Sequence, residues 1–187
     1  MKSDSRASVR AKAAAARRAQ PAWAALPYSK RAAAVRRFAA LMRRDAERSA
    51  RLLTRETGKP IAQARNEVNA LQGRLDFFLK ETPALLKPEA VRDAGGTAEE
   101  TRQEPLGVVL NISAWNYPYF VGSNVFIPAL LTGNAVLYKP SEFAALTGAN
   151  IRRLLVAAGV PGGVFQLLSG DGRVGAWALE EPVDAVF

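Results

Sequence analysis

The stretch LGVVLNISAWNYPYFVGSNVFIPALLTGNAVLYKPSE, residues 106–142, decides the fold. It opens with an apolar run, Gly107 to Ser113, that is too short for a helix and does not alternate, as expected of a strand buried on both faces of a parallel sheet. Pro118 to Leu131 fits a buried helix with proline in its first turn, and Ala135 to Lys139 is the next strand. Ligands of such sheets bind outside the carboxyl ends of the strands, so chemistry is expected there.

The residues after this stretch continue the alternation of helix and strand. Ala144 to Ala158 has a helical pattern, Val164 to Leu168 is a third strand, Arg173 to Glu181 is a short helix, and Val183 to Phe187 begins a fourth strand. This alternation predicts an α/β fold with right-handed crossovers and a parallel sheet. Because the chain stops inside an apolar strand, we expect it to be part of a longer protein.

Helices are predicted before the sheet. Residues 7–20 are rich in Ala and Arg and should form a helix that ends at Pro21. An apolar stripe predicts one long helix from Ser29 to Thr57, stopped by Gly58, and a second stripe predicts a helix from Pro60 to Lys80. Both stripes need a partner surface, which the sheet can supply.

The segment VRDAGGTAEETRQEP, residues 91–105, lacks an apolar pattern. Its Gly-Gly turn between polar residues of modest strand propensity is compatible with a plain loop or with a β arm that leaves the main body. We therefore divide the chain into N-terminal helices at 1–91, a β arm at 92–105 and the first part of a sheet domain at 106–187.

The formal net charge of +9 comes from the N-terminal region, where residues 1–55 hold 15 Lys and Arg against 3 Asp and Glu. The arginines from Arg31 to Arg55 follow a helical pattern opposite apolar residues, which indicates a solvated helix face, and no nucleic-acid partner is predicted. No apolar run is long enough to cross a bilayer, so no membrane partner is predicted either.

The sequence contains no Cys and no His, which excludes disulfides and thiolate chemistry and removes the commonest general base and metal ligand. The carboxylates are scattered rather than grouped at ligand spacing, so we predict no metal site. Residues 1–20 are rich in Arg and Ala and mildly resemble a mitochondrial presequence. The preferred interpretation is a frayed basic helix start in a cytoplasmic protein.

Polar residues follow the first two strands. In SAWNYP, residues 113–118, the Asn116 amide could donate to an oxyanion together with a backbone N–H, or could simply stabilise a turn. In LYKPSE, residues 137–142, Lys139 and Glu142 could bind the sugar hydroxyls of a nucleotide, with Ser141 as a helix N-cap, or could belong to an ordinary surface loop.

A literal G-x-G-x-x-G pattern follows the third strand. Gly170, Gly172 and Gly175 stand after a strand and before a helix, the context that the dinucleotide fingerprint requires. The acid expected about twenty residues later would lie beyond Phe187, and such patterns arise easily in β-to-α turns. The pattern is therefore either a pyrophosphate cradle or a turn near a cofactor.

Taken in order, three motifs resemble the NAD(P)-dependent aldehyde dehydrogenase superfamily. They are EPLGVVLNISAWNYP, PALLTGNAVLYKPSE, and GVPGGVFQLLSGDG followed by EPVDAVF, and the upstream RETGKP matches as well. The resemblance implies a Rossmann-like parallel sheet with flanking helices, preceded by long N-terminal helices and a protruding β arm. It also implies that the main phosphate motif begins at Phe187, so that the pattern at Gly170 is not the main pyrophosphate cradle.

The resemblance implies site residues. Asn116 matches the amide that stabilises the thiohemiacetal oxyanion. Lys139 and Glu142 match the residues that hold the adenosine ribose, and an acid at 142 favours NAD over NADP because a 2′-phosphate would meet like charge. The implied cofactor contacts are Ile112, Ser113, Ala114, Trp115, Lys139, Pro140, Ser141, Glu142 and Gly172.

The resemblance also implies a function for the full-length enzyme, the oxidation of an aldehyde to a carboxylic acid with NAD(P)+, in a homodimer or homotetramer assembled through the arm. The nucleophilic Cys and the general-base Glu of the family lie in later segments, so the chain alone is predicted to be inactive. The alternative is a non-catalytic nucleotide-binding or oligomerisation module from a truncated gene. A basic nucleic-acid-binding protein is a weaker rival.

Overall fold

The core of the molecule is a four-stranded parallel sheet. The computed structural model describes residues 2–94 and 97–187, and the parallel strands are β3 (Val108–Ser113), β4 (Ala135–Pro140), β5 (Phe165–Leu167) and β6 (Ala185–Val186). Their order across the sheet is β5-β4-β3-β6. The four strands predicted from apolar runs are confirmed, although β5 and β6 are shorter than the runs that predicted them.

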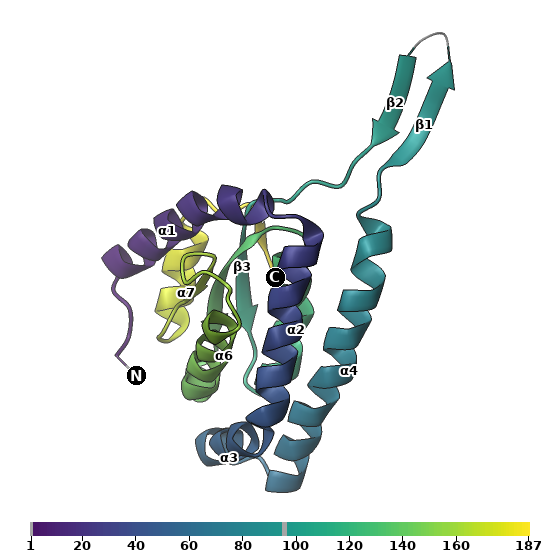
Figure 1. The fold of residues 1–187 in the computed structure, drawn as a ribbon. Helices are drawn as coiled ribbons and strands as arrows, with labels where there is room; N and C mark the ends of the chain where they lie inside the picture. Colours follow the sequence, from purple (N-terminus) through teal and green to yellow (C-terminus); the bar gives the residue numbers. More distant parts are fainter. Residues whose placement is uncertain (1, 95–96) are drawn as a thin grey trace.

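Helices cover both faces of the sheet. They are α1 (Arg6–Ala24), α2 (Tyr28–Arg44), α3 (Ala46–Thr57), α4 (Ile61–Leu85), α5 (Pro118–Leu131), α6 (Ala145–Ala157) and α7 (Gly172–Leu179), with a 3-10 turn, η1 (Glu142–Ala144), before α6. α5 and α6 pack on one face and α1 and α7 on the other, while α2, α3 and α4 form a layer outside α5 and α6 (Figure 1). The predicted bounds of α5 are confirmed.

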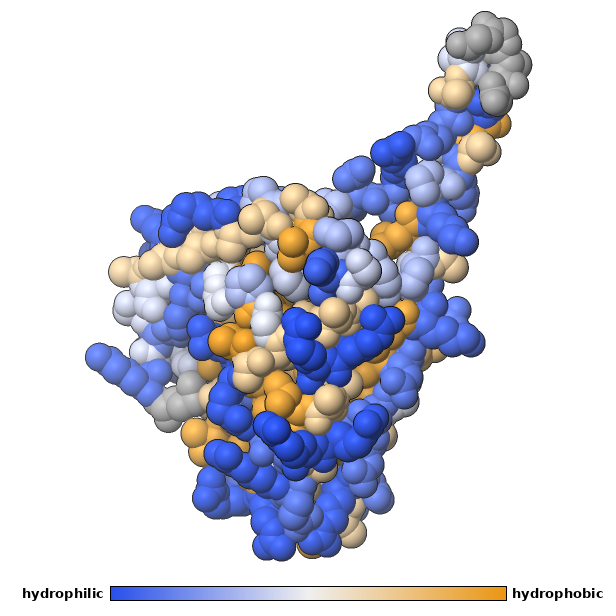
Figure 2. Space-filling model, in the orientation of Figure 1, coloured by the Kyte–Doolittle hydropathy of each residue, from blue (hydrophilic) through white to orange (hydrophobic). Residues whose placement is uncertain are grey.

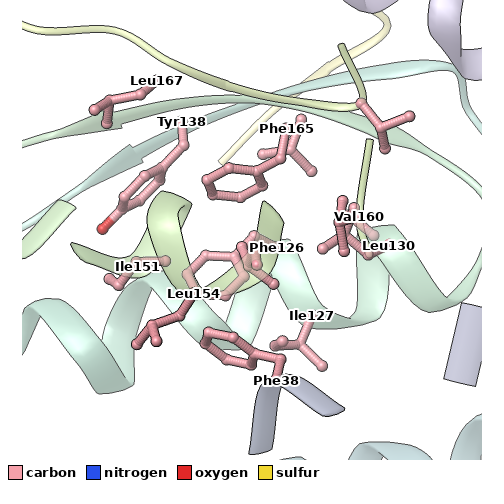
Figure 3. Close-up of a cluster of buried hydrophobic side chains, with 14 of the residues drawn as sticks. Phe38, Phe126, Ile127, Leu130, Tyr138, Ile151, Leu154, Val160, Phe165 and Leu167 are labelled. Atoms are coloured by element: carbon pink, nitrogen blue, oxygen red, sulfur yellow. The ribbon is translucent and has the colours of Figure 1, made fainter. Parts of the chain in front are cut away.

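Aromatic rings fill the space between the sheet and α5. Phe126 of α5, Tyr138 of β4 and Phe165 of β5 are fully buried, and each pair of their ring centroids is 5.5 Å apart. Figure 3 shows Phe38 of α2 on the far side of α5, so the same core continues into the outer helices. Burial of each such side chain contributes roughly 1.5–3 kcal/mol, which makes this cluster a main source of stability.

The strand order creates a switch point next to β3. The chain passes from β3 to β4 and β5 in one direction, and β6 then pairs with the opposite side of β3, with Val109 beside Ala185. The connections on the two sides of β3 therefore leave toward opposite faces, and a crevice opens at the carboxyl ends of the strands. The sequence predicted a parallel sheet but not this order.

The first helix extends further than predicted. α1 continues through Pro21 to Ala24, whereas the sequence placed its end at Pro21. Trp23 explains the extension, because this residue is only 3% exposed and its Nε1 donates to the Leu130 carbonyl at 2.9 Å. A buried indole with its N–H paired fixes the last turn of the helix against α5.

The predicted long helix from Ser29 to Thr57 is two helices. Asp45, with φ −95° and ψ 11°, separates α2 from α3, and its carboxylate accepts a hydrogen bond from Arg153 of α6 at 2.5 Å. The apolar stripe passes through the break because Met42 and Leu53 are buried on either side of it. The predicted stop at Gly58 is confirmed, since Gly58 caps α3 in the left-handed conformation.

The fourth helix also runs past its predicted end. α4 passes through Pro83 and ends at Leu85 instead of Lys80. Proline at this position cannot donate to the carbonyl four residues earlier, that of Leu79. The Tyr28 hydroxyl donates to that carbonyl at 3.1 Å, so the loss is compensated by a side chain of α2.

The start of α1, where the sequence suggested a frayed helix, is capped and bound to the segment after β5. Ser5 is the N-cap, and its hydroxyl accepts from the Ser8 backbone N–H at 3.2 Å. The Asp4 backbone N–H donates to the Ser169 carbonyl at 2.8 Å, which ties the segment before the helix to the end of β5.

The polar segment after α4 is an extended hairpin rather than a plain loop. β1 (Glu89–Ala94) and β2 (Thr97–Thr101) are antiparallel, with Glu89 opposite Thr101 and an irregularity between Ala90 and Arg92. The hairpin projects from the body on a narrow neck (Figure 1), and every residue of β2 is exposed. The predicted Gly95-Gly96 turn lies outside the described residues.

Most of the arginines predicted to lie on a solvated helix face are exposed, and Figure 2 shows hydrophilic residues gathered over α3 and the neighbouring ends of α2 and α4. Arg31 is an exception. It is 8% exposed, and it donates from Nε to Leu131 O at 2.9 Å and from Nη1 to Ala24 O at 2.8 Å. Within residues 2–94 and 97–187, no helix is long and apolar enough to cross a membrane.

Candidate functional site

The two predicted loops lie side by side at the carboxyl edge of the sheet. Ser113 ends β3, and its carbonyl accepts from the Ser141 N–H, after β4, at 2.9 Å. The rings of Trp115 and Phe143 meet edge to face with centroids 6.5 Å apart, although both side chains are largely exposed. The structure therefore brings the loop that carries Asn116 against the loop that carries Glu142.

The face of the sheet that packs on α1 and α7 carries several predicted cofactor residues. Lys139 is only 3% exposed, and its Nζ lies 3.6 Å from Glu142 Oε2. Ile112 is opposite Lys139 in the strand register, so the two side chains point to the same face, and Ile112 is 41% exposed. Gly172 begins α7, which packs against β3, and no heavy atom would lie within 4 Å of a Cβ at Gly172.

The remaining predicted residues differ in exposure. Ala114, Trp115 and Asn116 form an exposed run that faces solvent beyond the end of β3. The Ser113 hydroxyl points the other way, toward α5, where it and the Tyr138 hydroxyl would both lie 3.1 Å from a Cβ at Gly122. Burial raises the pKa of the Tyr138 phenol, so this hydroxyl stays protonated. The structure thus separates the Ser113 side chain from Lys139 and Ile112.

Two buried or half-buried carboxylates hold the helices that follow these strands. Glu67 of α4 accepts the Tyr119 N–H of α5 at 2.9 Å, and its other oxygen accepts from Lys59. Glu56 of α3 accepts the Thr147 N–H of α6 at 2.8 Å and the Leu146 N–H. The N-terminal amides of both helices are therefore already bound by carboxylates.

Sequence reasoning missed these two residues. Glu67 carried a usable signal, because it lies at stripe spacing with Ala64, Val68 and Leu71, so an acid there predicts a buried partner. Glu56 carried none, since its partner Thr147 is 91 residues away in the sequence.

The glycine turn after β5 also binds a carboxylate, that of Asp4. Gly170 has a φ of 138°, and a Cβ there would lie 2.4 Å from the Ser3 hydroxyl. The neighbouring Ser169 N–H donates to Asp4 Oδ2 at 2.7 Å, and Lys12 Nζ donates to the same carboxylate at 2.7 Å. Burial opposes ionisation of Asp4, but the hydrogen bonds from Lys12, Ser169 and Ser8 outweigh it and lower its pKa.

The third helix at this edge supplies its own carboxylate. Asp171 caps α7 by accepting the Arg173 N–H at 3.0 Å, which is the main reason that the pKa of Asp171 is lowered. The starts of α5, α6 and α7 and the turn at Ser169 thus all have amides occupied by protein carboxylates. The Lys139–Glu142 pair places a donor and an acceptor at this edge, and each of these helix starts has at least one amide bound to a carboxylate.

The surface has two notable hollows, one of them beside the site region. One of about 270 Å³ lies beside the Asn116 loop, between Tyr117, Phe120 and the α4 residues Gln63, Asn66, Glu67 and Ala70. A larger hollow of about 600 Å³ lies away from the sheet edge, among Glu47, Arg48, Arg51, Leu52, Arg55 and Asn150. Across the part of the chain that the structure describes, no three His, Cys, Asp or Glu side chains are grouped to hold a metal ion.

An open parallel sheet with a switch point, an amide-bearing loop and a lysine–carboxylate pair at its carboxyl edge defines a Rossmann-like α/β protein. The model of the aldehyde dehydrogenase family matches residues 1–186. The chain therefore belongs to the aldehyde dehydrogenase family.

Solved structures support this assignment. An NAD-dependent aldehyde dehydrogenase from Sinorhizobium meliloti is similar at 33% identity with a TM-score of 0.92, over 98% of this chain and 37% of that one. An NAD-dependent benzaldehyde dehydrogenase from Corynebacterium glutamicum is similar at 30% identity with a TM-score of 0.90, over 97% and 41%. The chain thus spans about two fifths of the length of these enzymes.

Proposed function

We propose that residues 1–187 form the N-terminal, cofactor-binding part of an aldehyde dehydrogenase that oxidises an aldehyde to a carboxylic acid with NAD. The observation that carries the proposal is the pairing of the Asn116 loop with the Lys139–Glu142 loop at the switch point, in a chain that belongs to this family. In this proposal the chain divides into N-terminal helices, an arm and the first part of the cofactor domain at 106–187, with the start of the arm moved from the expected residue 92 to Glu89, where β1 begins.

The proposed roles follow from position. The Asn116 amide is exposed beyond β3, where its NH₂ can donate to the carbonyl oxygen that gains negative charge when a nucleophile adds to the aldehyde. NAD, when bound, supplies the nicotinamide ring that takes up the hydride. Lys139 and Glu142 hold the adenosine ribose, and Ile112, Ala114, Trp115, Pro140, Ser141 and Gly172, with the Ser113 backbone, line its surroundings.

Preference for NAD over NADP is part of the proposal. The Glu142 side chain is 45% exposed and lies 3.6 Å from Lys139, so it can accept hydrogen bonds from ribose hydroxyls. A 2′-phosphate at the same place would face its negative charge. Lys139 offsets part of that repulsion, so we expect a preference rather than an exclusion.

The binding role is tested by titrating the isotope-labelled chain with NAD and following backbone amide shifts. We expect shifts at 112–116 and 139–143, and a smaller response to NADP. Glu142→Gln should bring the responses to NAD and NADP closer together, and Glu99→Gln on the exposed arm is the matched control. Shifts confined to other parts of the chain, or an unchanged NADP response in Glu142→Gln, would contradict the ribose assignment.

The absence of a thiol gives a second test. The purified chain should form no NADH when supplied with NAD and an aldehyde, because its sequence contains no Cys to add to the carbonyl. If NADH-forming activity copurified with the chain, the proposal that the nucleophile lies outside residues 1–187 would be wrong. The full-length protein is expected to carry out the oxidation.

The β1–β2 hairpin suggests an assembly role, and we extend the proposal to a homodimer or homotetramer joined through it. The hairpin projects from the body, and its exposed strands have free backbone edges that a second chain could extend (Figure 1). Sedimentation of the full-length protein with and without residues 89–101 tests this role. Loss of the larger species on deletion is expected, and an unchanged mass would contradict it.

A further inference from the structure

The junction between α3 and α4, residues 56–67, contacts the Asn116 loop and the start of α6, the helix that follows the Glu142 loop. Glu56 lies in the last turn of α3, Gly58 reverses the chain with a φ of 73°, and Glu67 lies in the second turn of α4. These twelve residues, here called the junction, lie far from both strands in the sequence. Their side chains nevertheless supply the caps that the helices after β3 and β4 lack locally.

At the first loop, Lys59 and Glu67 act together. The Glu67 side chain is fully buried, and its two oxygens are shared between the Tyr119 N–H and the Lys59 ammonium. Lys59 Nζ also donates to the backbone carbonyl of Asn116 and lies 3.8 Å from the ring centroid of Tyr117. One lysine therefore fixes the peptide that follows the Asn116 side chain.

At the second loop, Glu56 plays the corresponding part. Its two oxygens accept from the amides of Leu146 and Thr147 and from the Thr147 hydroxyl at 2.7 Å. The helix they cap, α6, is joined to Glu142 by the single turn η1. Three hydrogen bonds thereby tie the junction to the first turn of α6, a few residues after Glu142.

Local capping was available and is not used at these two helices. α7 has its own Asp171 at the N-cap, whereas the N-cap positions of α5 and α6 are Tyr117 and Ala144, with no side-chain cap. A Ser, Asp or Asn at those positions would satisfy the amides without a distant partner. Local caps would leave the two loops independent of each other, whereas the remote caps fix each loop relative to the other.

We infer that Lys59 and Glu67 are positioning residues for Asn116, and that Glu56 is the positioning residue for the Glu142 loop. The junction then sets the spacing between the reaction side and the ribose side of one site. The effect of these residues on catalysis rests on the proposed function. Their effect on the positions of the two loops, here called the mechanical part, does not. None of the three residues touches a reacting atom.

Amide hydrogen exchange of the 187-residue chain tests the mechanical part. Lys59→Met should raise exchange in the first turn of α5, residues 119–121, by roughly tenfold, because Glu67 loses its charged partner. Exchange at 146–149 should change less than about twofold. Glu56→Gln is the matched variant and should give the reverse pattern, faster exchange at 146–149 with little change at 119–121.

The two variants separate positioning from general destabilisation. Faster exchange at both segments in either variant, or no change at 119–121 in Lys59→Met, would overturn the inference. A second readout comes from the full-length protein, where Lys59→Met should lower kcat roughly 10- to 100-fold with little change in KM for NAD. Glu56→Gln should instead raise KM for NAD. If the wild-type full-length protein did not oxidise aldehydes, the proposed function would be contradicted. The hydrogen-exchange pattern of the two variants would still test whether the junction positions the two loops.

Discussion

The amino edge of the sheet and the loop that follows β3 at its carboxyl edge differ in burial. At the amino edge, where the strands begin, polar side chains are buried and bind backbone groups of the sheet and of the helix ends. Arg31 and Asn134 are 8% and 4% exposed, and Asn134 Oδ1 accepts the Gly107 N–H at 2.8 Å. At the carboxyl edge the residues from Ala114 to Tyr117 are all exposed, and Lys59, in the link between α3 and α4, contacts the Asn116 carbonyl and the Tyr117 ring.

This difference in burial suggests that residues of the amino edge mainly stabilise the fold, whereas residues of the exposed loop serve binding. A polar group buried with all its partners contributes to stability, and its removal leaves buried groups unpaired. An exposed amide on a loop contributes little to stability and remains free to meet a ligand. We therefore expect substitutions at the amino edge to unfold the chain more easily, and substitutions at the carboxyl edge to change binding or local motion.

The largest effect is expected for Arg31→Met. The guanidinium caps the carboxyl ends of α5 and α1 through Leu131 O and Ala24 O, and its loss leaves buried carbonyls without a charged donor. We expect the free energy of unfolding to fall by about 3 kcal/mol. Chemical denaturation followed by tryptophan fluorescence measures this. Arg36→Met, on the exposed side of the same helix, is the control and should change the value by less than about 0.5 kcal/mol.

A pair of Asn→Ala substitutions tests the comparison directly. Asn134→Ala removes an acceptor for Gly107 and a donor to Thr132, so a loss of about 2 kcal/mol is expected in the same denaturation experiment. Asn116→Ala should cost less than about 0.5 kcal/mol. Under the proposed function the order reverses in the full-length protein, because loss of an oxyanion donor typically lowers kcat roughly 10²- to 10³-fold. Equal stability losses for the two variants would break the comparison.

Two glycines on the α3–α4 side give effects of opposite sign. Gly58 needs its positive φ of 73°, and a Cβ there would meet nothing within 4 Å, so Gly58→Ala introduces backbone strain alone. We expect a loss of about 1 kcal/mol. Gly73 lies inside α4 with equally open space, and Gly73→Ala should stabilise the chain by up to about 1 kcal/mol. Thermal unfolding of both variants measures the difference.

The smallest effect is expected from pH. Burial opposes ionisation of Asp184, but Arg17 and the Val108 N–H outweigh it and lower its pKa below the usual 3.8, and the pKa of Asp4 is lowered likewise. Each carboxylate therefore stabilises the fold above its unfolded-state pKa, and this stabilisation is lost as pH falls through the folded-state value. Unfolding measured from about pH 5 to about pH 2 should show the loss. Asp184→Asn should make the dependence shallower, and a steeper one would contradict the assignment.

Local signals predicted the parts of the fold that depend on local sequence. Pro118 and Thr132-Gly133 mark both ends of α5, and the helix has the bounds that they predict. The break at Asp45 was missed because the apolar stripe is continuous in the sequence while the chain turns in space. The strand order was not predicted because the sequence of β6 does not indicate which strand it pairs with.

Some parts of the candidate site could likewise be predicted from local sequence, and others could not. The Asn116 loop and the Lys139–Glu142 loop were predicted from the residues that follow each strand, and the structure places them together. The supporting groups were not predicted, because Glu67 reaches Tyr119 across 52 residues and Asp4 reaches Ser169 across 165. Contacts of that range are decided by how whole elements pack, and single-sequence patterns do not contain them.

The attachment of α1 has a consequence for how the chain folds. The first helix is held by partners near the other end of the chain, with Arg17 bound to Asp184 at 2.5 Å and Asp4 bound at Ser169. During synthesis this helix emerges before β5, α7 and Asp184, so its docking surface is complete only after those parts have been made. Closing a loop of this length costs chain entropy before the contacts form, so docking of α1 is expected to be a late step of folding.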